Sequence, residues 1–247
     1  MLSFVTLIAY DYRYALRTIS SYYDIADEII LGLDKDRISF SQRPFPFDAA
    51  EFHRGLAALD VAHKIRLIED DFHPLPHPMD NDQYERRVLA RACKPGNWVI
   101  QIDADEFLLN PDEFAEWIKQ VPADTGIMGR WVTIFKQFGD QYLLIEEPDA
   151  FIPIGTKLRD QYVASRRADQ PHIKSPLVIL HQAWGRSRTD LELKLRNWAH
   201  SPDFDVDNYL RLWDAVTLDN YTQLKNFHPV YPPYWPSLER VELSAFA

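Results

Sequence analysis

Two aspartates that follow a short apolar run are the first candidates for chemistry. Asp103 and Asp105 come directly after Trp98-Val99-Ile100-Gln101-Ile102, and apolar residues return at Phe107. Such a run indicates a buried strand of a parallel sheet, whose side chains alternate between two faces. We therefore expect both carboxylates on one side of the strand's carboxyl end. Because neighbouring carboxylates repel each other unless a cation lies between them, the pair predicts a site for Mg²⁺ or Mn²⁺.

The Asp-x-Asp spacing by itself is weak support for that site. The same spacing recurs at 34/36, 80/82 and 203–207, and the copies at 80/82 and 203–207 lie in polar segments flanked by proline. The pair at 103/105 differs because five residues of strand-like sequence precede it. This context favours a functional role for Asp103 and Asp105.

Composition limits the classes of protein to which the chain can belong. The 247 residues, 46% of them hydrophobic, can form one large α/β domain or two small ones. A net charge of −10 argues against nucleic acid as the main partner and against broad adhesion to anionic lipid. The single cysteine, Cys93, argues against a disulfide framework and a cysteine-based zinc cluster, and favours a cytoplasmic location. No apolar run approaches the roughly 20 residues of a membrane span, so peripheral association is the membrane contact left open.

Strands and helices are expected to alternate through the first half of the chain. Strands are expected at 3–9, 29–33, 64–69 and from Trp98, with helices at 12–25, 48–60, 80–94 and from Asn110 to Pro122. Asp11 is placed to cap the first helix. Because the crossover of a strand-helix-strand unit is right-handed, consecutive strands are parallel. The order predicts a doubly wound, mostly parallel α/β sheet whose fourth strand carries Asp103 and Asp105.

The pattern changes after Gly126 and predicts a mixed extension with a C-terminal arm. Residues 150–175 are basic and irregular, so we expect loops there, and the aromatic, proline-rich end is expected to form one or two helices and an extended arm. Strands are expected at 127–135 and 141–146, as a hairpin around Phe138-Gly139-Asp140, and at 177–180, ending at His181; a helix is expected at 189–199.

Two segments of this chain resemble motifs of a known family. Asp103-Ala104-Asp105-Glu106-Phe107-Leu108 resembles the Asp-x-Asp motif of GT-A-fold glycosyltransferases, in particular family-2-like enzymes. His181-Gln182-Ala183-Trp184-Gly185-Arg186-Ser187 resembles the His-x-x-Trp-x-Arg-Ser segment of some bacterial members. The later segment Asn197-Trp198-Ala199-His200-Ser201 also resembles sequences of this family. The resemblance covers the topology of the first 110 residues and the motifs between 181 and 201.

The resemblance implies a single GT-A-like, Rossmann-like domain. Residues 1–109 would form its nucleotide-sugar-binding half, 110–201 its acceptor-side half and 202–247 a packing arm. The implied activity is that of a metal-dependent glycosyltransferase of the hexosyltransferase type, which moves a sugar from a UDP- or GDP-sugar to a hydroxyl of a glycan or lipid-linked acceptor in polysaccharide assembly.

The resemblance also implies roles for individual residues. Mn²⁺ or Mg²⁺ would be held by Asp103, Asp105 and His181, with imidazole favouring Mn²⁺. Asp34 would recognise uracil or guanine, Tyr10 and Asp11 would flank the base, and Asp103 would face the ribose or the metal. Diphosphate charge would be offset by Arg186, Arg188 or Lys157. The family's acidic pair before an acceptor-side helix is missing, so Glu147, Asp190 and Glu106 stay open as the catalytic base.

Other interpretations stay open. A sugar nucleotidyltransferase usually needs a glycine-rich phosphate loop after the first strand, and Tyr10-Asp11-Tyr12-Arg13 contains no glycine. A non-catalytic carbohydrate- or protein-binding module on a transferase scaffold is the third interpretation. His73 and His77 could bind a metal, although the prolines of the segment that carries them favour a solvated loop. Arg86, Arg87 and Arg91 form either a solvated helix face or a contact with an anionic ligand.

Overall fold

Four parallel strands form the first half of the sheet in a computed structural model that describes residues 1–147, 149–231 and 234–242. Their order is β3 (Ile65–Asp70), β2 (Glu28–Asp34), β1 (Leu2–Ile8) and β4 (Trp98–Gln101). Every residue of β1 and β2 is buried, as expected for parallel strands covered on both faces. The predicted mostly parallel sheet is confirmed, and β4 is its fourth strand in the order of the sequence.

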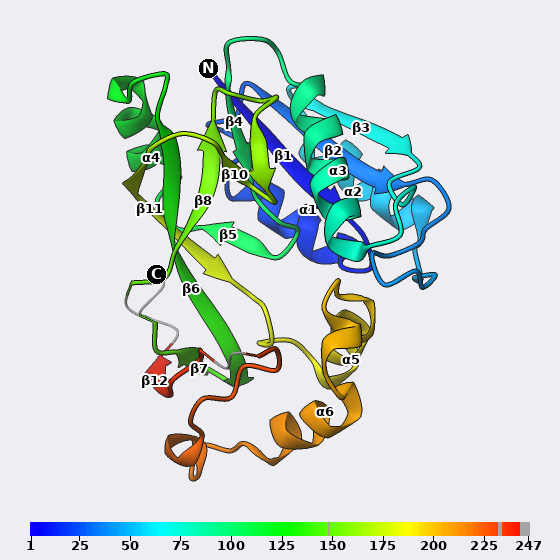
Figure 1. Ribbon diagram of the computed structural model, residues 1–247, viewed down its shortest axis with the longest axis vertical. Coiled ribbons are helices and arrows are strands. Elements are labelled where there is room, and N and C mark those ends of the chain that lie inside the picture. The colour runs from blue at the N-terminus through cyan, green and yellow to red at the C-terminus, as the bar shows by residue number, and fades with distance from the viewer. Residues whose placement is uncertain (148, 232–233, 243–247) are drawn as a thin grey trace.

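Helices cover both faces of these strands (Figure 1). Helices α1 (Tyr12–Ser20) and α2 (Ala49–Leu59) pack one set of alternating strand residues, and α3 (Pro78–Ala92) packs the other. Phe4 and Leu31 belong to the first core, whereas Val5 and Ile30 belong to the second. This alternation follows the two-residue period of a strand and makes the fold doubly wound.

The strand predicted from Trp98 ends earlier than expected. Strand β4 stops at Gln101, residues 104–105 form a turn, and β5 (Glu106–Leu108) pairs antiparallel with β11 (His172–His181). Alternation along one strand is therefore not what places Asp103 and Asp105. The turn after β4 brings them to the carboxyl edge of the sheet instead. Helix α1 also stops at Ser20, five residues before its predicted end, because residues 21–25 form turns.

The second half of the sheet is mixed. Strand β6 (Gly126–Phe138) forms the predicted hairpin with β7 (Gln141–Ile145), and Gly139 supplies the positive φ of 61° at its turn. The prediction of loops at 150–175 is wrong, because β8 (Phe151–Thr156) runs antiparallel between β4 and β6. Its Pro153 and Gly155 disfavour a strand locally, yet two neighbouring strands supply partners. A small ladder of β9 (Tyr162–Ala164) and β10 (Arg167–Ala168) follows.

The C-terminal arm packs a second apolar core that includes Phe135, Trp184, Trp213 and Trp235. Its last strand, β12 (Leu238–Glu242), pairs antiparallel with β7, so the arm adds an edge strand to the main sheet. Residues 148, 232–233 and 243–247 of the predicted segments lie outside the described residues. No helix that the structure describes is long and apolar enough to cross a membrane. The remaining elements are α4 (Pro111–Trp117), α5 (Arg188–Asn197), α6 (Val206–Ala215) and 3-10 helices at Ile118–Gln120, Ser201–Asp203 and Tyr221–Gln223.

Candidate functional site

A cleft of about 540 Å³ opens where β1, β2 and β4 end. We call it the main cleft. It is lined by residues from the ends of these strands, from β6 and β11, from α5 and from the C-terminal arm, among them Asp34, His73, Asp103, Asp105, Trp131, Glu147 and His181. This is the edge at which the sequence predicts the site, because open α/β sheets bind ligands at the carboxyl ends of their strands.

Asp103 lies between two arginines. Its Oδ1 accepts a hydrogen bond from Arg86 at 2.9 Å and its Oδ2 accepts one from Arg166 at 2.5 Å. Burial raises the pKa of Asp103, but the two guanidinium groups outweigh it and lower that pKa to about 2. The carboxylate is therefore ionised, and its charge is balanced by protein cations.

Asp105 is buried among three further basic side chains. Its Oδ2 accepts hydrogen bonds from Arg186 and from Lys194, the latter at 2.6 Å, and lies 3.5 Å from Nε2 of His181. Burial raises the pKa of Asp105, whereas Lys194 and Arg186 lower it more, and the pKa stays well below its ordinary value. The predicted proximity of Asp105 and His181 is present in the structure.

The basic partners of the two aspartates include Arg86 and Arg186, which the sequence analysis names, and Lys194 and Arg166, which it does not. Arg86 lies on the buried face of α3 with Asp82, which accepts a hydrogen bond from its Nε at 3.0 Å. Lys194 is buried between Leu191 and Leu195 of α5. Polar residues at apolar positions of a helix were the available signal for both. Arg166 lies between β9 and β10 and gave no signal beyond its charge.

Glu106 lies deeper than the other predicted base candidates and does not line the main cleft. Its side chain has no exposed surface, and both carboxylate oxygens accept hydrogen bonds from Arg166 at 2.8 Å. It also accepts the backbone N–H of Asp103 at 2.8 Å. These contacts tie Glu106 to the turn that presents Asp103 and Asp105, so it positions the two aspartates.

The three predicted metal ligands do not converge on one point. Asp105 and His181 lie together, but Asp103 faces Arg86 and Arg166, and no three His, Cys, Asp or Glu side chains of the described residues are grouped to hold a metal. Each aspartate also carries two cationic partners where a metal would bind. The donor set does not fit a three-ligand metal site in this arrangement, and the metal role stays a prediction.

Asp34 and His73 form a buried pair at the end of β2. Oδ2 of Asp34 lies 2.9 Å from Nδ1 of His73, and both side chains are less than a tenth exposed. Burial raises the pKa of Asp34, but hydrogen bonds from the Ile38 backbone and from His73 lower it below its ordinary value. His77 is exposed at the start of α3, so the two histidines do not form the metal pair considered from the sequence.

The main cleft is also lined by aromatic rings and by a further acidic residue, Glu147. The rings of Trp131 and His181 stack with centroids 4.3 Å apart and planes 5° from parallel. Glu147 lines the same cleft and is half-buried, and burial raises its pKa above the ordinary value. A carboxyl group with a raised pKa in the lining of a cleft suits acid-base chemistry.

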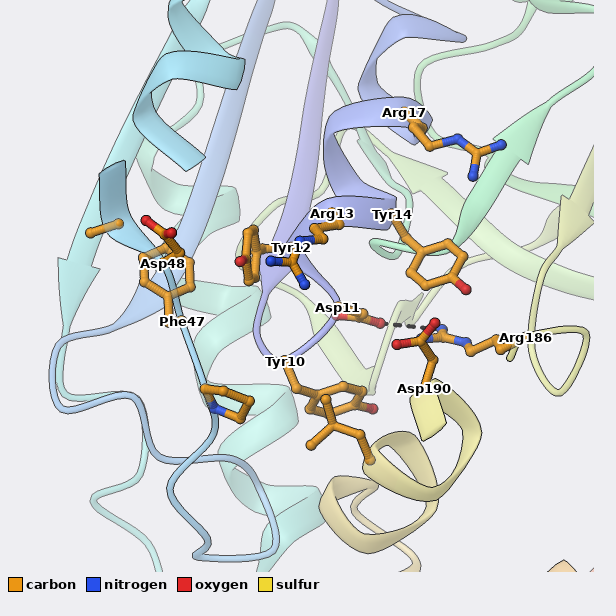
Figure 2. A pocket seen from close by; sticks show the side chains of 13 residues that line it. Tyr10, Asp11, Tyr12, Arg13, Tyr14, Arg17, Phe47, Asp48, Arg186 and Asp190 are labelled. Carbon is orange, nitrogen blue, oxygen red and sulfur yellow. Dashed lines mark hydrogen bonds and ion pairs between the residues drawn. The ribbon is translucent and has the colours of Figure 1, made fainter. Parts of the chain in front are cut away.

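A second cavity of about 720 Å³, which we call the side cavity, lies at the β1–α1 turn and shares Tyr10 and Asp11 with the main cleft. Figure 2 shows Arg186 reaching Asp11, with the ring of Tyr14 beside it. Asp11 occupies the N-cap position of α1, but its side chain makes no capping bond and instead lies 3.3 Å from Arg186. Arg186 therefore lines the side cavity and contacts both Asp11, which lines the two cavities, and Asp105, which lines the main cleft.

Several predicted residues lie outside the main cleft. Asp190 lines the side cavity, where it accepts a hydrogen bond from the hydroxyl of Ser187 at 2.8 Å. Arg188 pairs with Asp214 and Glu192 and lines neither cavity. Lys157 lies over the ring of Trp98 and also lines neither. The prediction that these two basic residues reach the site is therefore not supported by their positions.

The three arginines of α3 separate into two groups. Arg86 faces the main cleft, whereas Arg87 donates to the Tyr162 carbonyl at 2.6 Å and Arg91 pairs with Asp160 on the surface. The alternatives left open by the sequence therefore apply to different members of the set. Arg86 contacts the carboxylate of Asp103, as expected of a residue that binds anions. Arg87 and Arg91 hold the segment around β9 against α3.

No model of a protein family matches the chain, and no curated protein does. Solved structures do match. HddC from Yersinia pseudotuberculosis, complexed with GMP-PN, is 10% identical, with 73% of this chain and 93% of that one covered and a TM-score of 0.41. A nucleotidyl transferase from Methanothermobacter thermautotroptrophicus is 15% identical, with 87% and 96% covered and a TM-score of 0.34. CTP:phosphocholine cytidylyltransferase from Streptococcus pneumoniae is 15% identical, with 97% and 93% covered and a TM-score of 0.30.

The last two structures are nucleotidyltransferases by name, which is the class of the alternative interpretation. At these identities and TM-scores the likeness is too distant to assign an activity to this chain. The mixed α/β, Rossmann-like architecture rests on the chain's own strand order and crossovers.

Proposed function

We propose that the chain is a glycosyltransferase that takes a sugar from a UDP- or GDP-sugar and transfers it to an acceptor hydroxyl. The main support is the set of buried polar atoms that have no hydrogen-bond partner among the described residues and belong to the lining of the main cleft. A buried polar atom without a partner costs free energy, so such a set is expected where a polar ligand binds. The atoms include Ser39 Oγ, His73 Nε2, Asp82 Oδ2, Trp131 Nε1, His181 Nδ1 and Asn197 Oδ1.

The strand order arranges these groups along the cleft. Asp34 is the last residue of β2, and His73 follows β3. Asp103 and Asp105 follow β4, and Trp131 lies on β6 beyond β8. A nucleoside diphosphate sugar has the same linear order of base, diphosphate and sugar. In this proposal the base lies near β2 and β3, the diphosphate near the turn after β4, and the sugar toward β6 and β11.

Basic side chains near the turn would offset the charge of the leaving diphosphate. The ammonium group of Lys194 has three N–H donors, and Asp105 is the acceptor found for it among the described residues. Lys194 can therefore donate further hydrogen bonds to a diphosphate. Lys194 is buried, and an ion contact in such a site is stronger than in water. Arg86 and Arg166 would hold the other side of the diphosphate, since both already place guanidinium groups beside Asp103.

Glu147 is the catalytic base in this proposal. Of the three candidates from the sequence, it lines the main cleft, whereas Glu106 is tied to Arg166 and Asp190 faces the side cavity. The acceptor oxygen forms a bond to the anomeric carbon while the bond from that carbon to the diphosphate breaks. The hydroxyl proton passes to the Glu147 carboxylate, and the nucleoside diphosphate leaves. The acceptor in this proposal is a hydroxyl of a glycan or of a lipid-linked molecule in polysaccharide assembly.

Nucleotidyl transfer, the activity in the names of two similar structures, is the second candidate for the same cleft. The four cationic side chains around Asp103 and Asp105 would also suit a triphosphate. It takes second place because the β1–α1 turn is not a glycine-rich phosphate loop. Residues 9–13 contain no glycine, and none of them has a positive φ.

Titration calorimetry with UDP and GDP tests the proposal. We expect at least one of them to bind at micromolar to millimolar concentration. Parallel titrations with Mn²⁺, with Mg²⁺ and with EDTA test the predicted metal separately, and weaker binding in EDTA would support it. Failure of both nucleotides to bind at millimolar concentration, with and without metal, would rule out the proposed donor.

A further inference from the structure

The pair of Asp34 and His73 points to a more specific role for the base end of the main cleft. We propose that Nε2 of His73 recognises the nucleobase by accepting a ring N–H, as uracil presents at N3 and guanine at N1, and that Asp34 positions the imidazole ring of His73. This inference rests on the proposed function and names the class of base that the donor carries. It moves the base contact that the family resemblance implies for Asp34 to His73, which lies beside it.

Asp34 itself has little capacity left for a base. Its Oδ1 accepts the backbone N–H groups of Asp36 at 3.0 Å and Ile38 at 2.9 Å. Its Oδ2 accepts the N–H of Phe72 at 3.3 Å and lies 2.9 Å from Nδ1 of His73. A carboxylate offers about four lone-pair sites, and all of them face groups of the protein. Asp34 therefore holds the loop after β2 and the loop after β3 together by hydrogen bonds, and it orients the ring of His73.

The contact with Asp34 decides which nitrogen of His73 carries the proton. A carboxylate with a lowered pKa is ionised and can only accept, so Nδ1 is the donor in this contact. In a neutral imidazole the other nitrogen, Nε2, then has a free lone pair. That Nε2 is buried and has no partner among the described residues, and His73 lines the main cleft. An N–H of a ligand would satisfy it.

The surroundings of His73 suit a flat base. The ring of Phe40 lies 5.4 Å from the His73 ring, and Leu7 and Ile38 also line the cleft. Uracil at N3 and guanine at N1 carry an N–H that can point at a single acceptor. Cytosine at N3 and adenine at N1 carry a lone pair instead, so two acceptors would face each other. The arrangement predicts discrimination between these two classes of base.

Binding of UDP, GDP, CDP and ADP to the wild type and three variants tests this inference by calorimetry. We expect UDP or GDP to bind about tenfold or more tightly than CDP and ADP, because cytosine and adenine would leave the Nε2 acceptor of His73 without an N–H donor. His73→Ala is expected to lose most of this preference while keeping its affinity for CDP. His73→Gln, whose amide oxygen can accept the same N–H, is expected to retain part of the preference.

His77→Ala is the matched control, because His77 is exposed and lies on the same loop at the start of α3. It should bind all four nucleotides as the wild type does. Retained affinity of His73→Ala for CDP shows that this variant is folded. Equal affinity of the wild type for all four nucleotides, or an unchanged preference in His73→Ala, would overturn the role of His73 and leave the proposed function standing. No binding of any nucleotide would overturn both.

Discussion

Replacing Arg166 by alanine is expected to destabilise the fold by about 3 to 5 kcal/mol, the usual cost of leaving a buried charge without its partner. The side chain of Arg166 is 9% exposed, and that of Glu106, its main partner, is 0% exposed. The substitution removes two hydrogen bonds of 2.8 Å to Glu106. Glu106 keeps the backbone N–H of Asp103 but loses its cation, whereas Asp103 keeps Arg86. The cost therefore arises mainly at Glu106.

Denaturant unfolding at neutral pH measures this cost. Arg91→Ala is the matched control, because it breaks an arginine–aspartate pair with Asp160 that is more than half exposed and should cost about 1 kcal/mol or less. Adding Glu106→Gln to Arg166→Ala should recover part of the lost stability, since the buried charge is then gone. If Arg166→Ala and Arg91→Ala lose the same free energy, the account of the turn after β4 is wrong.

Two further predictions concern single carboxylates. Glu147→Gln should lower the rate of sugar transfer by about 10²- to 10⁴-fold with unchanged affinity for the nucleotide. The control Glu146→Gln, which changes the exposed neighbouring residue, should have little effect on either quantity. Because burial raises the pKa of Glu147, the wild-type rate should fall as pH drops through a value above the pKa of an ordinary glutamate, and a pH profile without this fall would contradict the role of Glu147 as the base. Asp103 has a pKa lowered from 3.8 to about 2, so its ion pairs stabilise the fold above pH 3.8 and this contribution is lost as pH falls toward 2. The free energy of unfolding of Asp103→Asn should therefore depend less on pH in that window than that of Asp140→Asn, a control variant in an exposed turn. An equal pH dependence of the two variants would count against the two ion pairs.

The parallel half of the fold could be predicted because local and global signals agree there. Strands β1 and β2 are continuous apolar runs, and the helices between them have an apolar face, so strand, helix and crossover follow from periodicity. The position of Asp103 and Asp105 at the carboxyl edge followed from the same signals. The detailed reason was wrong, since a turn after Gln101 places them and not alternation along a strand.

The mixed half was harder to predict because its strands depend on distant partners. Strand β8 contains Pro153 and Gly155, and it forms between β4 and β6, which are far away in the sequence. Such pairing is a tertiary effect that overrides local propensity. The short β9–β10 ladder, which brings Arg166 into the site, could not be foreseen for the same reason.

The site residues divide along the same line. Sequence reasoning found the acids, because Asp103, Asp105 and Asp34 end apolar runs. It also named Arg86, Arg186 and His181, which contact these acids in the structure. It missed Lys194, whose position between Leu191 and Leu195 was a weak signal, and Arg166, whose charge alone does not distinguish a buried side chain from a solvated one. It also assigned Arg188 to the diphosphate, whereas this side chain pairs with Asp214 outside both cavities. Only the folded chain shows which charges meet.

The most direct test of the central claim is to identify the phosphate product that the purified chain releases. The chain is incubated with UDP- and GDP-sugars in the presence of Mn²⁺ or Mg²⁺, and separately with nucleoside triphosphates plus sugar phosphates. We expect release of UDP or GDP from the sugar nucleotide, strongly reduced in Glu147→Gln and unchanged in Glu146→Gln. Release of pyrophosphate from the second mixture, with no nucleoside diphosphate from the first, would contradict glycosyl transfer and establish nucleotidyl transfer instead.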